Sequence, residues 1–165
     1  MKRKLKGFTL IEIIVVIAII GVLAAILVPS MLGYVRKSKI QGANTTANAL
    51  HKAVSSYATD LDIENLYLPE GIHSISDGSC TEAEEVNLGE FAKDIKPYFS
   101  EIERVDAAFY ISDGQCVAVS IKTGNYYGTY PPFLTAKNWD HYSDELTNKE
   151  AVIEKTLQVN DIDVD

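Results

Sequence analysis

The chain has 165 residues and a formal net charge of −8, from 15 basic and 23 acidic residues. Four of the basic residues precede position 7, and without them 11 basic residues face 23 acidic ones, a balance of −12. A surface this acidic repels phosphate groups, so nucleic acid is not an expected partner. The sequence also lacks the motifs of nucleophile-elbow hydrolases, nucleotide-binding loops and zinc proteases. We therefore expect neither an enzyme nor a cofactor.

The segment from Phe8 to Val28 consists almost entirely of Ile, Val, Leu and Ala. About 20 such residues at a rise of about 1.5 Å match the hydrocarbon core of a bilayer, so residues 8–35 are predicted to form a transmembrane helix. The basic residues before it predict a cytoplasmic amino end and an exported remainder. The run is too long for an ordinary secretory signal, and a plain anchor would not explain the acid Glu12 inside it.

The residues Lys6-Gly7-Phe8-Thr9-Leu10-Ile11-Glu12 resemble the processing site of type IV prepilins and the related type II secretion pseudopilins, a class III prepilin signal sequence. The resemblance covers roughly the first 35 residues. It implies that residues 1–7 are a leader, cut between Gly7 and Phe8 by a prepilin peptidase. It further implies that Phe8 is then N-methylated and that Glu12 acts in filament assembly.

Elementary electrostatics supports a role for Glu12 in assembly. After the cut, Phe8 would carry an amine that is positively charged near neutral pH, and Glu12 lies one helical turn away on the same face. An unpaired charge among apolar helices is costly, so pairing of carboxylate and amine would select the register between subunits. The alternative interpretation is an uncut anchor with an incidental acid.

Beyond the anchor the pattern becomes amphipathic and predicts one helix from Phe8 to about Thr59. Gly21 and Pro29 are expected to break or loosen this helix, and they match positions where helices of filaments in the resembling family are often melted. Seven residues spaced alternately by three and four form the predicted inner stripe: Ile40, Ala43, Ala47, Leu50, Val54, Tyr57 and Leu61. The stripe suits packing on a sheet of the same chain better than a coiled-coil seam.

The exported head, residues 36–165, is predicted to be α+β, with the long helix packed on a small antiparallel sheet as in the pilin fold. Residues 36–60 form its helix and residues 61–104 a connecting αβ-loop in which a short helix carries Phe91 and Ile95 inward. Residues 105–130 form a three-stranded meander, because apolar residues alternate on both sides of the turn Asp113-Gly114.

The carboxyl-terminal region, residues 131–165, is predicted to hold either a helix that Thr147 caps and that runs through Val159, or a strand from Val152 to Val159. Asp161, Asp163 and Asp165 alternate as at the start of a calcium loop, but a solvated acidic end is the favoured interpretation.

Six aromatic residues could line a ligand groove, but the preferred interpretation is that they belong to the core of the head: Tyr126, Tyr127, Tyr130, Phe133, Trp139 and Tyr142. Export favours a disulfide between Cys80 and Cys116 over two free thiols.

The resemblance implies a structural subunit of a type IV pilus-like filament, a fimbrium with roles such as adhesion or motility. The expected partners are copies of the same chain, the prepilin peptidase, a pilus or secretion machinery, and membrane lipid before assembly. The expected location is a single-pass membrane protein that becomes a surface filament. A type II secretion pseudopilin is the first alternative, and a membrane-tethered adhesin or binding protein is the second.

Overall fold

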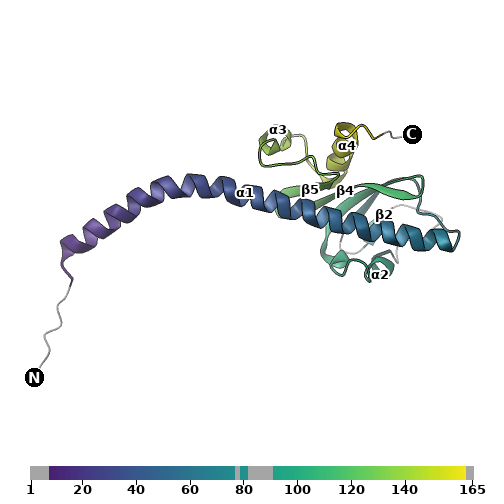
Figure 1. Ribbon diagram of the computed structural model, residues 1–165, viewed down its shortest axis with the longest axis horizontal. Helices are drawn as coiled ribbons and strands as arrows, with labels where there is room; N and C mark the ends of the chain where they lie inside the picture. The colour runs from purple at the N-terminus through teal and green to yellow at the C-terminus, as the bar shows by residue number, and fades with distance from the viewer. Residues whose placement is uncertain (1–7, 77–78, 82–90, 163–165) are drawn as a thin grey trace, which may run out of the picture. The chain divides into compact units, whose positions relative to one another are not determined.

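The computed structural model describes residues 8–76, 79–81 and 91–162. The chain divides into two compact units, one ending at Arg36 and the other beginning at Lys37. The elements occur in the following order (Figure 1): α1 (Leu10–Ile63), β1 (Gly71–Ser76), β2 (Ser79–Thr81), α2 (Phe91–Ile95), η2 (Ile102–Arg104), β3 (Asp106–Ser112), β4 (Gln115–Thr123), β5 (Tyr126–Tyr130), α3 (Trp139–Tyr142) and α4 (Lys149–Val159).

Helix α1 runs for 54 residues and ends four residues later than the sequence predicted. Its end is closed by two backbone bonds, from the Leu66 N–H to the Leu61 carbonyl and from the Asn65 N–H to the Asp62 carbonyl, both 3.0 Å. Asn65 adopts a positive φ of 56°, as the residue after a helix often does. All seven residues of the predicted inner stripe are buried, and Ala53 and Ala58 join them.

The sheet has five antiparallel strands in the order β2-β1-β3-β4-β5. The predicted meander is confirmed as β3, β4 and β5, each within one residue of its expected bounds. Asp113 and Gly114, with φ of 52° and 70°, form the two-residue turn between β3 and β4. Both residues need positive φ there, which explains why Asp-Gly is such a strong hairpin signal.

Strands β1 and β2 correct the prediction that residues 61–104 only connect helix and sheet. Strand β1 pairs with β3, setting Ile75 opposite Ala107, and extends the meander on the edge away from β5. The short helix α2 is confirmed, with Phe91 and Ile95 buried. Its expected start at Asn87 lies outside the described residues.

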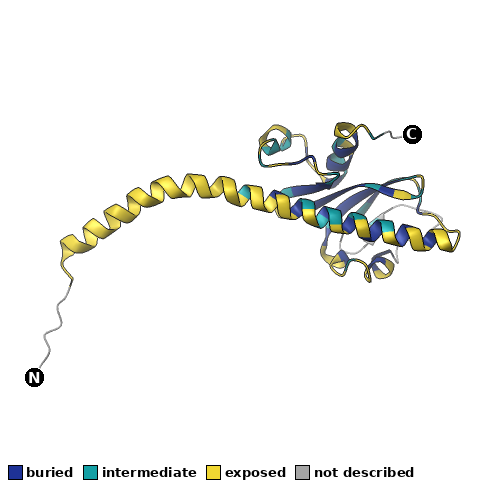
Figure 2. Cartoon of the chain, in the orientation of Figure 1, coloured by how far each residue is buried: buried dark blue, intermediate teal, exposed yellow. Residues whose placement is uncertain are grey.

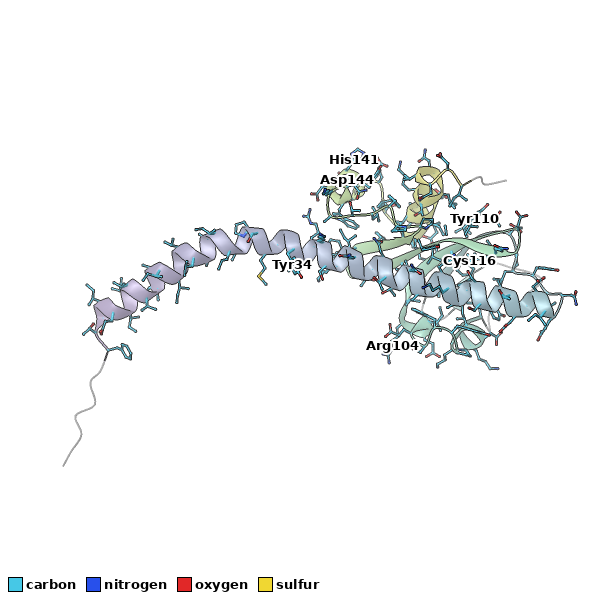
Figure 3. All side chains as sticks on the ribbon, viewed as in Figure 1. Tyr34, Arg104, Tyr110, Cys116, His141 and Asp144 are labelled. Atoms are coloured by element: carbon cyan, nitrogen blue, oxygen red, sulfur yellow. The ribbon has the colours of Figure 1, made fainter. Side chains whose placement is uncertain are left out.

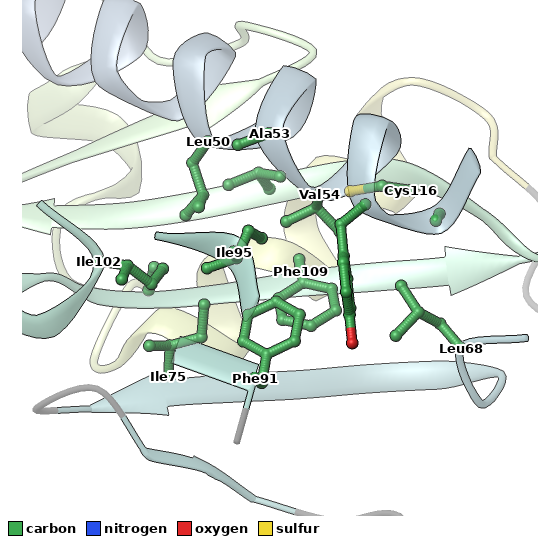
Figure 4. Packing of buried hydrophobic residues seen from close by; sticks show 14 of the residues in the cluster. Leu50, Ala53, Val54, Leu68, Ile75, Phe91, Ile95, Ile102, Phe109 and Cys116 are labelled. Carbon is green, nitrogen blue, oxygen red and sulfur yellow. The ribbon is translucent and has the colours of Figure 1, made fainter. Parts of the chain in front are cut away.

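Helix α1 and helix α4 cover opposite faces of the sheet. On one face, α1 and α2 pack against β3 and β4 in the main core, where Phe91 stacks on Phe109 with ring centroids 5.2 Å apart (Figure 4). On the other face, Ile153 and Leu157 of α4 pack against Tyr110 and neighbouring residues of the sheet. The strands β3 and β4 are therefore buried on both sides. The α+β class and the helix-on-sheet packing are confirmed.

The contact between α1 and the edge strand β5 depends on a glycine. A Cβ added at Gly128 would overlap the backbone of Ala43, so only glycine permits this approach. Beside it, the Asn44 side chain accepts a hydrogen bond from the Thr129 N–H at 2.8 Å and donates one to the Leu134 carbonyl at 3.0 Å. Asn44 thus satisfies an amide on the open edge of the sheet.

The carboxyl-terminal region forms a helix, which resolves the choice between helix and strand. Helix α4 begins one residue later than predicted, because Asn148 rather than Thr147 caps it, accepting from the Ala151 N–H at 2.7 Å. The aromatic residues of this region pack as core, the preferred interpretation: Phe133 and Tyr127 are buried, and Tyr126 lies 4.9 Å from Trp139 between ring centroids.

Candidate functional site: the amino-terminal assembly segment

Glu12 and Thr9 form a reciprocal pair at the start of α1. The Glu12 Oε2 atom accepts from the Thr9 N–H at 2.8 Å and from the Thr9 hydroxyl at 2.7 Å. The Glu12 N–H in turn donates to Thr9 Oγ1 at 3.3 Å. This is the capping box that Thr-x-x-Glu forms at a helix start, worth about 1 kcal/mol per cap. The spacing was visible in the sequence, but only the acid was given a role there.

The capping box leaves part of the Glu12 carboxylate unused. Both bonds from Thr9 go to Oε2, and Oε1 accepts none from the residues that the structure describes. Phe8 is 85% exposed and directly precedes Thr9. Gly7, the other half of the predicted cleavage site, lies outside the described residues. The arrangement can therefore hold the helix start and still offer one oxygen to a cation.

Residues 10–36 present apolar side chains on every side of the helix, and these side chains are exposed (Figures 2 and 3). Within the described part of the chain, one helix, α1, is long and apolar enough to cross a membrane. Its most apolar 18 residues have a mean hydropathy of 3.2, and none of them is buried inside the protein. Water would hydrate such a surface at large cost, so it needs lipid or other helices around it.

At Gly21 and Pro29, where the sequence predicted a broken or loosened helix, α1 keeps a helical backbone in this single chain. Pro29 cannot donate to the carbonyl one turn earlier, but the turns on either side keep the helical backbone. The Ser30 hydroxyl donates to the Leu27 carbonyl at 2.9 Å next to it. Melting inside a filament remains a prediction.

The predicted disulfide is not present in the structure, where Cys80 and Cys116 are not bonded to each other. The strand register explains this. Cys80 lies on the edge strand β2, opposite Ile75 of β1, whereas Cys116, which is labelled in Figure 3, lies on β4, opposite Ile111 of β3. The two cysteines are three strand spacings apart across the sheet and four residues apart along the strand direction. Together these offsets separate their Cα atoms by about 20 Å. A disulfide needs Cα atoms less than about 7 Å apart.

The proposed calcium ligands cannot be assembled from the described part of the chain. Asp161 is exposed with a φ of 51°, while Asp163 and Asp165 lie outside the described residues. Among the residues that are described, no group of three or more His, Cys, Asp or Glu side chains could hold a metal ion.

One polar cluster of the head was missed by the sequence analysis. The Lys149 Nζ atom, buried at the start of α4, donates to the Ile75 carbonyl at 2.7 Å and pairs with Asp106 at 2.6 Å. Beside it, the Ser74 hydroxyl donates to Glu150. These bonds tie α4 to β1 and β3. No short-range signal could have found them, since Lys149 and Asp106 are 43 residues apart.

Comparison with known proteins gives matches that cover part of the chain. A family model described as the prokaryotic N-terminal methylation motif matches residues 2–28. "Fimbrial protein EcpC" of Eikenella corrodens is 48% identical over 60 residues, 36% of this chain and 39% of that protein. "Type IV major pilin protein PilE" of Neisseria gonorrhoeae is 34% identical over 92 residues, 55% of this chain and 50% of that protein.

Secretion proteins match at a similar level. "Type II secretion system core protein G" of Vibrio cholerae is 45% identical over 58 residues, 35% of this chain and 40% of that protein. The matched segments span half or less of these relatives, and no solved structure matches. In the matched part, the chain is therefore similar to type IV pilins and to type II secretion proteins, and it carries the methylation motif.

Proposed function

We propose that this chain is a subunit of a type IV pilus-like filament, processed by a prepilin peptidase and polymerised through its apolar amino-terminal helix. The observation that most strongly supports this proposal is the position of Glu12. It lies in a capping box directly after Phe8, at the start of a helix whose apolar residues up to position 36 are exposed. A pilin-like subunit anchored in a membrane fits both the helix and the fimbrial relatives.

The proposed processing step gives a reason for the presence of Glu12 in an apolar segment. Cleavage between Gly7 and Phe8 would create an ammonium group at Phe8, and N-methylation of that amine would keep its charge. The free Oε1 of Glu12 can then pair with the ammonium of the same chain or of a neighbour. In a bundle of apolar helices with little water, only registers that satisfy both charges avoid a large desolvation cost.

The exposed apolar surface of residues 8–35 suits both proposed locations of the subunit, the membrane before assembly and the filament after it. Lipid would cover residues 8–35 while the subunit waits in the membrane, and the helices of sister subunits would cover them in the filament. A pilus or secretion machinery would extract the subunit from the bilayer. Lipid, copies of the chain, the peptidase and this machinery are therefore the proposed partners.

A type II secretion pseudopilin is the second candidate, because relatives named core protein G match at 42–47% identity over 57–60 residues. Electron microscopy of fibres sheared from cells at native expression separates the two functions. We expect long filaments that react with an antibody to the head. Filaments that appear only on overexpression would favour the pseudopilin.

The processing step is tested by the mass and the terminal sequence of the chain purified from membranes. We expect a chain that begins at methylated Phe8 and lacks Met1–Gly7. A chain that still begins at Met1 has no ammonium near Glu12, and the proposed filament mechanism fails.

The role of the charge is separated from the role of the cap by two variants. Glu12→Gln keeps an oxygen for the capping box but removes the charge, so we expect normal cleavage and loss of most filament incorporation. Thr9→Ala removes the hydroxyl but keeps the charge, so we expect incorporation close to that of the unmodified chain. The reverse pattern in sheared fractions would mean that Glu12 acts only as a cap.

A further inference from the structure

The turn that ends α1 is an exposed apolar and acidic projection of the head. This terminal turn, residues 62–67, carries Ile63 with 76% of its surface exposed, and Leu66 and Tyr67 are exposed as well. The two backbone bonds that close α1 fix its shape. Exposed apolar groups beside charges on a fixed turn are typical of protein contact surfaces.

The charges of the terminal turn are opposite to those that a helix end favours. Three exposed acids, Asp60, Asp62 and Glu64, lie at the carboxyl end of α1, and its last turn has no basic residue. This end of a helix carries partial negative charge and is stabilised by cations. No ion pair joins Asp62 or Glu64 to another residue of the described chain. The turn therefore has negative charge that the head itself leaves unbalanced.

A groove of complementary character lies between α1 and the loop after β5. This loop groove has a volume of about 440 Å³ and is lined by Lys37, Ile40, Gln41, Asn44, Leu134, Thr135, Ala136 and Lys137. Ile40 and Leu134 form an apolar floor, and the two exposed lysines are the charged residues of its lining. The bond from Asn44 to the Leu134 carbonyl holds the loop against the helix, so the groove is preformed.

The terminal turn cannot bind the loop groove of its own chain. Lys37 and Ile63 are separated by 26 residues of continuous helix, which at 1.5 Å per residue hold them about 39 Å apart. The turn of one copy can bind only the groove of another copy. Such a contact joins two different surfaces, and repeated copies then form an open chain rather than a closed pair.

We propose that the terminal turn of one head binds the loop groove of the next copy, with Ile63 and Leu66 on the apolar floor and Asp62 and Glu64 beside Lys37 and Lys137. The inference rests on the proposed polymerisation and names head surfaces that take part in it. Charge pairs at the rim of a contact contribute more to specificity than to affinity. The pairs of acids and lysines would select the axial offset between neighbouring heads, and burial of Ile63 would stabilise the contact at that offset.

Cysteine cross-linking in membranes and sheared fibres of cells that express the full chain tests the contact. We expect Ile63→Cys combined with Ala136→Cys to give a ladder of disulfide-linked multimers under mild oxidation, at least tenfold above either single variant. Each single variant controls for Cys80 and Cys116. Ile63→Cys combined with Gln158→Cys, an exposed site on α4, is the matched control and should give no ladder. Absence of the ladder in the first pair overturns the contact.

Exchanging the charges of a lysine and an acid tests the contact a second time. The disulfide-linked multimers are measured as before, in the chain that carries both cysteine substitutions. Lys137→Glu and Glu64→Lys should each reduce the multimers about tenfold, and the two together should restore them to within twofold. Lys39→Glu, which is exposed but does not line the groove, should change nothing. Failure of the combined variant to recover overturns the contact. Filaments without a ladder would refute this contact alone, whereas a ladder in cells that never form filaments would refute the proposed pilus alone.

Discussion

Two stretches of α1 share one backbone geometry but differ in what stabilises them. Residues 10–36 are apolar on all sides and expose those side chains, whereas residues 40–61 bury one stripe and expose polar residues elsewhere. The first pattern marks a helix covered by lipid or by other helices, and the second marks a helix covered by its own sheet. The head can therefore be stable by its own packing, while the anchor depends on its surroundings.

The largest predicted effect is at Gly128, the described glycine at which an added Cβ would meet the closest neighbours. Gly128→Ala would place a Cβ on the Ala43 backbone, which can move only with α1. We expect the free energy of unfolding of the head to fall by about 3 kcal/mol, the upper range for overpacking. Urea unfolding of the full chain in detergent, followed by the fluorescence of the single tryptophan, Trp139, measures it. An unchanged midpoint would mean that α1 does not pack closely on β5.

Lys149 tests whether one buried cation ties the back face of the sheet. Lys149→Met keeps the apolar stem and removes the ammonium that bonds Asp106 and the Ile75 carbonyl. We expect a loss of about 2 kcal/mol, below the 3–5 kcal/mol of a fully buried pair because Asp106 is half exposed. Lys155→Met, on the same helix but partly exposed beside Glu145, is the matched control and should cost under about 1 kcal/mol. Equal losses of stability in Lys149→Met and Lys155→Met would contradict the role assigned to Lys149.

The sequence predicted those parts of the fold whose signals are local. The stripe of α1 has helical spacing over three heptads, and the hairpins around Asp113-Gly114 and Gly124 join clearly alternating strands. Strand β1 was missed because its sequence, GIHSIS, has only two strongly apolar residues and begins with a glycine. It becomes a strand by pairing with the free edge of β3, a tertiary cause that its own residues do not encode.

The same distinction holds for the sites. The capping box and the processing motif lie within seven consecutive residues, so the sequence contained them entirely. The pairing of Lys149 with Asp106 and the separation of Cys80 from Cys116 both depend on strand register. That register includes β2, which the sequence did not predict. An argument from export alone could favour a disulfide but could not measure the distance across three strands.

A smaller effect is expected from pH, at the polar edge of the head core. His51 donates from Nε2 to the Cys116 carbonyl at 2.8 Å and stacks on Tyr130. Burial lowers the pKa of His51 from its usual 6.5, the Cys116 carbonyl opposes this, and Lys52 adds to it. The unfolded chain therefore binds the proton more readily, so this contribution is complete above about pH 6.5 and is lost as the pH falls through the lowered pKa.

The measurement compares the unfolding midpoint of the full chain in detergent between pH 7.5 and pH 5.5. Since His51 is half exposed and solvent screens its charge, we expect the effect to be smaller than that of Lys149. His51→Gln can keep a donor for the Cys116 carbonyl and should show a smaller decline with acidification. His141→Gln, at an exposed histidine, should decline as the unmodified chain does. Identical declines in all three proteins would exclude His51 as a source.

The smallest effect should come from a glycine of the anchor. A Cβ added at Gly33 meets nothing within 4 Å, unlike one at Gly128. Gly33→Ala should therefore leave the Trp139 unfolding midpoint of the head unchanged within error, even though alanine favours the helix by up to about 1 kcal/mol. Its effect should appear only where other helices cover residues 10–36, as a change in the yield of assembled chain. A shift of the head midpoint as large as that of Gly128→Ala would show that the two regions do not fold independently, and the contrast drawn between them would fail.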